Sequence, residues 1–128
     1  MRDPIPTFYA DVPEPLASVA ADYLQPHSLL SFNTALKSVH WGDEAYDAPT
    51  TGAGRRVNEG VGRRVYLRAS KDQAMPPSAQ DKFVEDSGVE WKVIELGTSH
   101  SPMLSQPERL AGVIGECVGD MVGTYGVE

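Results

Sequence analysis

Apolar side chains recur with helical spacing near the beginning of the chain. Within residues 13–24 they fall at Leu16, Val19, Ala20, Tyr23 and Leu24. Steps of three and four residues place such side chains on one face of an α-helix, so this segment predicts an amphipathic helix. Pro26 interrupts the pattern because proline breaks a helix, and residues 28–36 are compatible with a second short helix.

The middle of the chain shows no hydrophobic period. Residues 42–62 are rich in Gly, Arg, Thr and Pro. This composition predicts a long flexible loop, which is unusual inside a compact domain. The loop divides the chain into a helical segment at 1–41, the loop itself at 42–62, and a third part at 63–128.

The third part begins with a predicted strand and helix. Val65, Tyr66 and Leu67 start a short β-branched and aromatic run that ends near Ser70. The prolines at 76 and 77 then open a helix, because proline is favoured at the first helical position. We expect this helix to reach Ser87, with Gly88 as its C-terminal stop.

A second predicted strand and helix follow at once. Residues 89–96 carry the apolar content of a strand, and residues 97–104 predict a loop. Ser105 and Glu108 then fit the S-x-x-E capping box at the start of a last helix. Its apolar stripe comprises Leu110, Val113, Ile114, Cys117, Val118 and Met121. The order β-α-β-α predicts an α/β fold with two parallel strands joined by a right-handed crossover.

Two polar residues lie in the loops that follow the two predicted strands, namely Asp72 and His100. The carboxyl ends of parallel strands share one edge of a sheet, and neighbouring strands lie about 4.8 Å apart. An aspartate there can accept a hydrogen bond from one imidazole nitrogen and leave the other nitrogen free as a base. Taken singly, Asp72 also fits a turn residue and His100 a loop histidine bonded to backbone carbonyls. Their matched positions favour a functional pair.

Three segments of the chain resemble small α/β-hydrolases, the group that includes plant methyl esterases and hydroxynitrile lyases. Residues 64–76 are similar to the acid-bearing strand and loop of that group. The histidine loop at 99–108 follows the pattern H-x-P-x-L-x-x-P-x-x-L from His100 onward, and residues 8–36 resemble the helical cap. The resemblance implies a partial α/β-hydrolase fold, made of a cap piece and the last two βα units of a parallel sheet.

The same resemblance implies cofactor-free hydrolysis of small ester-type substrates through a Ser-His-Asp triad, with Asp72 as the acid and His100 as the base. The sequence contains no G-x-S-x-G nucleophile elbow, so the serine is expected outside this chain. The nearest match, at 97–101, lacks the final glycine and already holds His100, and we exclude Ser99 as the nucleophile. In the lyase members a lysine follows the histidine, whereas here Ser101 does, which favours an esterase.

Net charge, cysteine content and hydrophobicity indicate which partners and which location to expect for the chain. A net charge of -7 argues against nucleic acid and anionic membranes as partners. With one cysteine, Cys117, no disulfide framework is expected, and no metal site is expected because His27 and His40 lack ligands at a suitable spacing. The first ten residues show no signal peptide, and no stretch approaches about 20 apolar residues, so a cytoplasmic location is predicted.

Two alternative functions for the chain stay open. The chain could be a non-catalytic, truncated homologue that acts as a binding or oligomerisation module. It could also be part of an active enzyme whose serine comes from another polypeptide. Two strands alone leave a sheet edge unpaired, and we therefore expect self-association through that edge or a partner chain.

Overall fold

The computed structural model describes residues 3–26 and 64–123, with side chains through residue 120. The predictions for a helix at 28–36, a loop at 42–62, and His27 and His40 lie outside the described residues. The elements in chain order are α1 (Pro4–Phe8), α2 (Glu14–Asp22), β1 (Val65–Ala69), α4 (Pro77–Asp86), β2 (Lys92–Leu96), α5 (Pro102–Ser105) and α6 (Pro107–Gly123).

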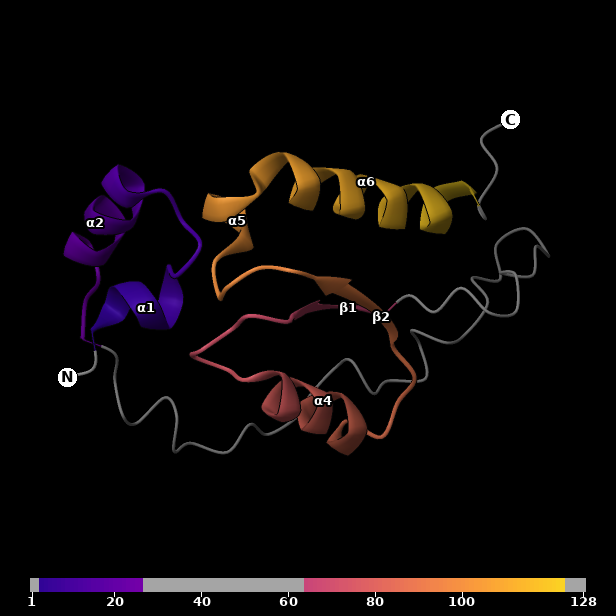
Figure 1. The fold of residues 1–128 in the computed structure, drawn as a ribbon. Helices are drawn as coiled ribbons and strands as arrows, with labels where there is room; N and C mark the ends of the chain where they lie inside the picture. Colours follow the sequence, from indigo (N-terminus) through magenta and orange to yellow (C-terminus); the bar gives the residue numbers. More distant parts are fainter. Residues whose placement is uncertain (1–2, 27–63, 124–128) are drawn as a thin grey trace.

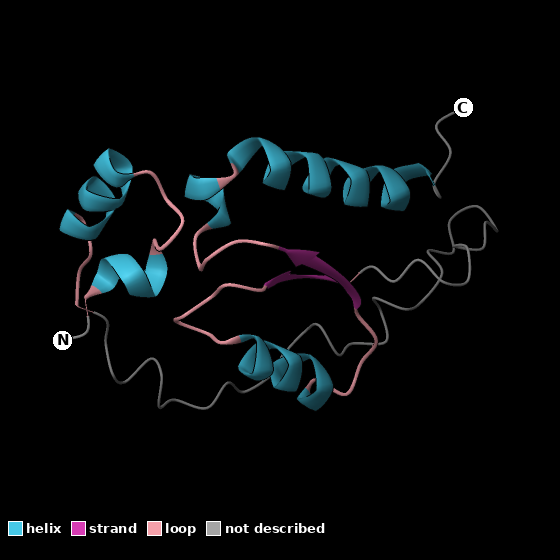
Figure 2. Cartoon of the chain, viewed as in Figure 1, coloured by secondary structure: helices cyan, strands magenta, loops and turns pink. Residues whose placement is uncertain are grey.

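The two strands form a parallel sheet in which Val65 pairs with Lys92 and Ala69 pairs with Leu96. Helix α4 makes the crossover between them, and Figure 1 shows α4 on one side of the strands and α6 on the other. Helices on both faces are typical of a parallel sheet, because the crossovers have to run over those faces. The predicted β-α-β-α order and the parallel pairing are confirmed for the described residues (Figure 2).

The second strand is shorter than its sequence indicates, since it begins at Lys92 and not at residue 89. A turn occupies the preceding residues. Gly88 has a φ of 69°, and the Ser87 hydroxyl donates to the Val84 carbonyl at 2.6 Å and accepts from the Trp91 indole N–H at 2.8 Å. These bonds hold the chain in a turn as far as Trp91, and β2 begins at the next residue, Lys92.

The predicted loop at 97–104 and the predicted capping box are wrong in part. Residues from Pro102 onward form the short helix α5, and Ser105 is its last residue and not the cap of α6. The Ser105 hydroxyl is buried and has no hydrogen-bond partner within the described residues. Prolines decide both starts, because Pro102 and Pro107 each stand at a first helical position, where their fixed φ suits a helix.

Helix α2 packs on its small residues. The helix predicted within residues 13–24 is present as α2, but its buried residue is Ala17, which is 1% exposed, while Val19 is 52% and Tyr23 80% exposed. Ala17 packs with Tyr9 and Val12, and partly buried neighbours of this cluster include Phe8 and, from α5, Leu104. Short α1, which the hydrophobic pattern did not reveal, begins where the Asp3 carboxylate accepts from the Ile5 N–H at 3.0 Å.

The last helix is buried along only part of its predicted stripe. Cys117 is 8% exposed, whereas Ile114 and Val118 are about half exposed, at 48% and 51%. Across residues 3–26 and 64–123, no helix is long and apolar enough to cross a lipid bilayer. The described fold is therefore a small parallel sheet with helices, and it leaves much apolar helix surface open.

Candidate functional site

The loops after β1 and β2 lie beside each other at the carboxyl edge of the sheet. The parallel hydrogen-bond ladder continues past the strands, because the Ser70 N–H donates to the Leu96 carbonyl at 2.9 Å and the Lys71 N–H to the Thr98 carbonyl at 3.0 Å. This continuation carries the two loops side by side as far as the predicted site residues.

Asp72 uses its two carboxylate oxygens for different purposes. Oδ1 accepts from the N–H groups of Ala74 and Met75 at 2.8 and 2.9 Å, and Oδ2 lies 2.9 Å from His100 Nδ1. Asp72 is a buried residue, only 5% exposed, so these bonds and not water hold its carboxylate. The predicted meeting of Asp72 and His100 is confirmed, and the turn role that Asp72 could have had alone is present beside it.

His100 keeps one ring nitrogen available. Its side chain is 41% exposed, and Nε2 has no hydrogen-bond partner among the described residues. When Nδ1 carries the hydrogen that Asp72 accepts, Nε2 presents a lone pair. The edge of the ring meets Phe8 of α1, with centroids 5.3 Å apart. The imidazole is thus oriented from two sides and free at the nitrogen that a base would use.

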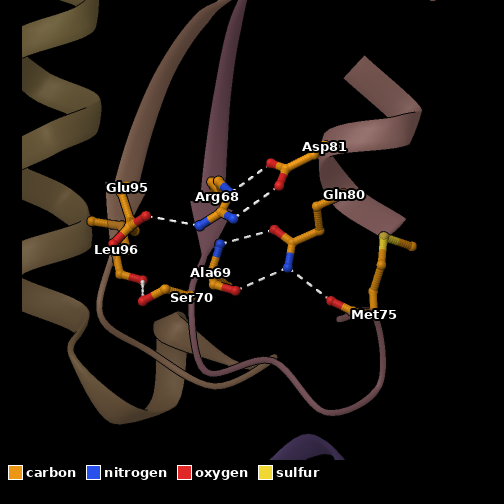
Figure 3. A network of polar contacts seen from close by, with 8 residues as sticks. All are labelled: Arg68, Ala69, Ser70, Met75, Gln80, Asp81, Glu95 and Leu96. Carbon is orange, nitrogen blue, oxygen red and sulfur yellow. Dashed lines mark hydrogen bonds and ion pairs between the residues drawn. The ribbon is translucent and has the colours of Figure 1, made fainter. Parts of the chain in front are cut away.

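Gln80 of α4 holds the loop that carries Asp72 (Figure 3). Its amide oxygen accepts from the Ala69 N–H at 2.9 Å, and its amide nitrogen donates to the carbonyls of Ala69 at 2.9 Å and Met75 at 2.7 Å. Gln80 is only 2% exposed. These bonds tie the end of β1 to the start of the α4 segment, so they fix both ends of the turn between them.

An arginine on β1 joins three elements next to this amide (Figure 3). Arg68 donates to both carboxylate oxygens of Asp81 on α4, at 2.6 and 2.9 Å, and to Glu95 on β2 at 2.7 Å. The hydrogen bond from Arg68 lowers the pKa of Asp81 below its ordinary range. Both acidic partners are more than half exposed, so solvent screens the ion pairs and their contribution to stability is modest.

The charges of this cluster also reach the neighbouring aromatic residues. Tyr66 packs with Phe83 and Trp91, with ring centroids 6.0 and 6.2 Å away. Burial raises the pKa of the Tyr66 hydroxyl, and the negative charge of Asp72 adds to the increase.

Ser99 precedes His100 but does not face it. The residue is fully buried, at 0% exposed, and its hydroxyl donates to Asp11, which also accepts from the Ser99 N–H at 2.9 Å. This burial supports the exclusion of Ser99 as the nucleophile. Asp11 and Gln80 are the site neighbours that the sequence did not reveal, because Asp11 bonds a residue 88 positions away and no local pattern marks the amide of Gln80.

The described residues offer no metal centre. No group of three or more histidine, cysteine, aspartate or glutamate side chains within them could hold a metal ion. Chemically, the arrangement at this edge is an oriented imidazole with one open nitrogen.

Comparison with known proteins points in the same direction over part of the chain. A stretch of 55 residues, 43% of the chain, is 33% identical to the Arabidopsis thaliana protein named "Putative methylesterase 14, chloroplastic". The match covers 16% of that protein, so the chain spans about a sixth of the length of this relative. No protein-family model matches the chain. The similarity indicates a hydrolase-like origin.

Proposed function

We propose that the chain carries the acid and the histidine of an esterase-type α/β-hydrolase site, and that the nucleophilic serine lies outside it. The observation that carries the proposal is the 2.9 Å contact between His100 Nδ1 and the buried Asp72 carboxylate at the carboxyl edge of two parallel strands. The partial similarity to a protein named as a methylesterase supports it. In this proposal α1 and α2 are the cap piece of the partial α/β-hydrolase fold.

The proposed reaction is acyl transfer to serine followed by hydrolysis. His100 Nε2 takes the proton of the serine hydroxyl as the oxygen attacks the ester carbonyl, and a tetrahedral oxyanion forms. The imidazolium then returns this proton to the departing alcohol, which leaves an acyl-serine and neutral His100. Water repeats the sequence and releases the carboxylic acid. Asp72 accepts the Nδ1 hydrogen throughout and stabilises the charged ring.

Ester hydrolysis is favoured over cyanohydrin cleavage by the residue that follows His100. The related lyases carry a lysine there, and this chain carries Ser101, which is 6% exposed and has no cationic group. The substrate proposed is therefore a small ester, and no cofactor takes part.

A chimaera tests the proposal. The whole chain, residues 1–128, would replace the matching region of the Arabidopsis protein, and hydrolysis of p-nitrophenyl acetate would be followed at 400 nm. We expect turnover that falls about 10⁴-fold in Asp72→Asn, because the amide turns the imidazole to the wrong tautomer, and comparably in His100→Gln. Asp86→Asn is the matched control, because Asp86 pairs with Lys82 on the exposed side of α4 and should leave turnover unchanged. Full turnover in the folded His100→Gln chimaera would refute the assignment.

The 128-residue chain alone should show no enzyme-like turnover of the same ester, and its rate should stay far below that of the chimaera. General-base assistance without a placed nucleophile and oxyanion hole contributes about 10²–10⁴-fold at most, far less than an enzyme achieves. Turnover that disappears in Ser99→Ala would show that the exclusion of Ser99 is wrong.

A binding or oligomerisation module is the second candidate, and one observation favours it. Large apolar side chains stand open on α2 and α6, with Val19 on α2, Tyr23 directly after it, and Ile114 and Val118 on α6 all about half exposed or more. Such surfaces are typical of protein contacts. Light scattering coupled to size-exclusion chromatography tests the oligomerisation role, since a concentration-independent monomer would contradict it.

A further inference from the structure

We propose that Asp11 is a positioning residue for His100. Its carboxylate lies in the turn between α1 and α2 and accepts both the N–H and the hydroxyl of Ser99, the residue immediately before the histidine. The inference rests on the proposed function, because it explains how the same imidazole is held. It adds a residue that lies 88 positions away from the histidine loop.

The anchor is strong because its donors have no alternative partner. Ser99 is fully buried, so water cannot replace the carboxylate at either donor. Hydrogen bonds to an ionised acceptor are roughly twice as strong as neutral ones, and an abandoned buried donor is costly. Since one carboxylate holds both the backbone and the side chain of Ser99, it fixes the direction in which the chain enters His100.

The same anchor brings an aromatic ring to the histidine. Asp11 follows α1 closely, and Phe8 at the end of α1 meets the His100 ring edge-on, at 5.3 Å and an interplanar angle of 63°. Asp72 holds Nδ1 from one loop, and Phe8 contacts the ring from the amino-terminal helices. Releasing Asp11 should therefore loosen the histidine loop and remove its aromatic neighbour together.

Nuclear magnetic resonance of the ¹⁵N-labelled full chain tests this directly. Long-range ¹H–¹⁵N spectra at about pH 8, where an ordinary histidine is neutral, report the tautomer of each ring. The His100 signals are identified by their absence in His100→Gln. In the unaltered chain we expect the Nδ1–H tautomer and a ring-current shift from Phe8, which disappears in Phe8→Leu. In Asp11→Ala we expect a mixed tautomer and loss of that shift. Ser99→Ala, which keeps the backbone bond, should show an intermediate result.

Ala17→Gly is the matched control for a merely structural effect. It weakens the cluster that joins α1 and α2 but touches neither Ser99 nor His100, so the tautomer should stay as in the unaltered chain. Unchanged spectra in Asp11→Ala, or an equal loss in Ala17→Gly, would overturn the inference. The spectra require no turnover, so an inactive chimaera would count against the proposed function and leave this result standing.

Discussion

The carboxyl edge of the sheet differs from helices α2 and α6 in the kind of side chain that is buried. Around the edge many buried residues are polar, namely Asp72, Gln80, Thr98, Ser99 and Ser101, each at most 6% exposed. On α2 and α6 several large apolar residues are open, with exposures from 42% at Leu16 to 52% at Val19.

The comparison shows what holds each region. At the edge, order comes from specific hydrogen bonds, since the buried polar groups must find partners or lose free energy. On α2 the alanines contact the buried cluster and on α6 Cys117 is the buried residue, whereas the exposed large side chains of these two helices contribute little to the described fold. Replacing a buried polar residue at the edge should therefore be costly. Replacing an exposed apolar residue on α2 or α6 should be tolerated.

The largest effect is expected from Gln80→Met. The change keeps the length of the side chain but leaves the Ala69 N–H and two carbonyls without their partner. We expect a loss of about 3 kcal/mol in the free energy of unfolding, measured by urea denaturation. Gln106→Met is the control, because that amide accepts one exposed bond from Arg109, and it should change stability by less than about 0.5 kcal/mol. Equal effects in both variants would break the comparison.

A smaller effect is expected from enlarging the buried face of α2. Ala17→Leu forces extra volume against Tyr9 and Val12 and should cost about 1–3 kcal/mol. Val19→Gln on the same helix replaces a large apolar residue that is half exposed, and it should stay within about 0.5 kcal/mol. If thermal melts showed Val19→Gln to be the more damaging change, the face assigned as buried would be the wrong one.

A pH-dependent effect, smaller again, is expected from Asp81→Asn. Arg68 lowers the pKa of Asp81, so the folded chain binds this proton less readily than the unfolded chain. The contribution of Asp81 is therefore fully present above the ordinary aspartate pKa of about 3.9 and is lost as pH falls through the lower folded value. Urea midpoints should favour the unaltered chain at about pH 6, and the difference should shrink as the pH is lowered below the ordinary aspartate value.

The smallest effect on stability is expected from Ile114→Gln. This residue is 48% exposed on α6, so the change should shift the free energy of unfolding by less than about 0.5 kcal/mol. Self-association, if α6 takes part in it, should weaken at the same time, as sedimentation velocity at several concentrations would show. A clear loss of stability would instead place Ile114 in a core that the described residues do not complete.

Local patterns were sufficient to predict the alternation of strand and helix in residues 63–121 and the meeting of Asp72 with His100. Both depend on short-range rules, since strands, their loops and a crossover follow each other closely along the chain. The start of β2 was misplaced because Gly88 and Ser87 form a turn that an apolar run does not reveal.

Contacts between distant segments could not be predicted in the same way. The pairing of Asp11 with Ser99 depends on how the amino-terminal helices dock, and the role of Gln80 depends on the exact angle at which α4 crosses the sheet. The stripe of α2 shows a related limit, because an apolar face indicates a need for cover but does not identify what provides it. Here Ala17, which is outside the predicted stripe, makes the buried contact of the helix.

The position of the Gln80 amide also limits how the sheet can grow. The Lys92 N–H donates to the Arg64 carbonyl and the Ser70 N–H to the Leu96 carbonyl. The backbone N–H and C=O groups of the even-numbered residues along β1 therefore point toward β2, and those of the odd-numbered residues point away from it. Of the outward groups, those of Ala69 are already occupied by Gln80, which takes the place that a neighbouring strand would fill. Any strand that joins β1 from outside, whether from a second copy or from another polypeptide, is thus restricted to the part of β1 before Ala69. Within the described residues, Gln80 closes this outer edge at its carboxyl-terminal end, where the loop that carries Asp72 begins.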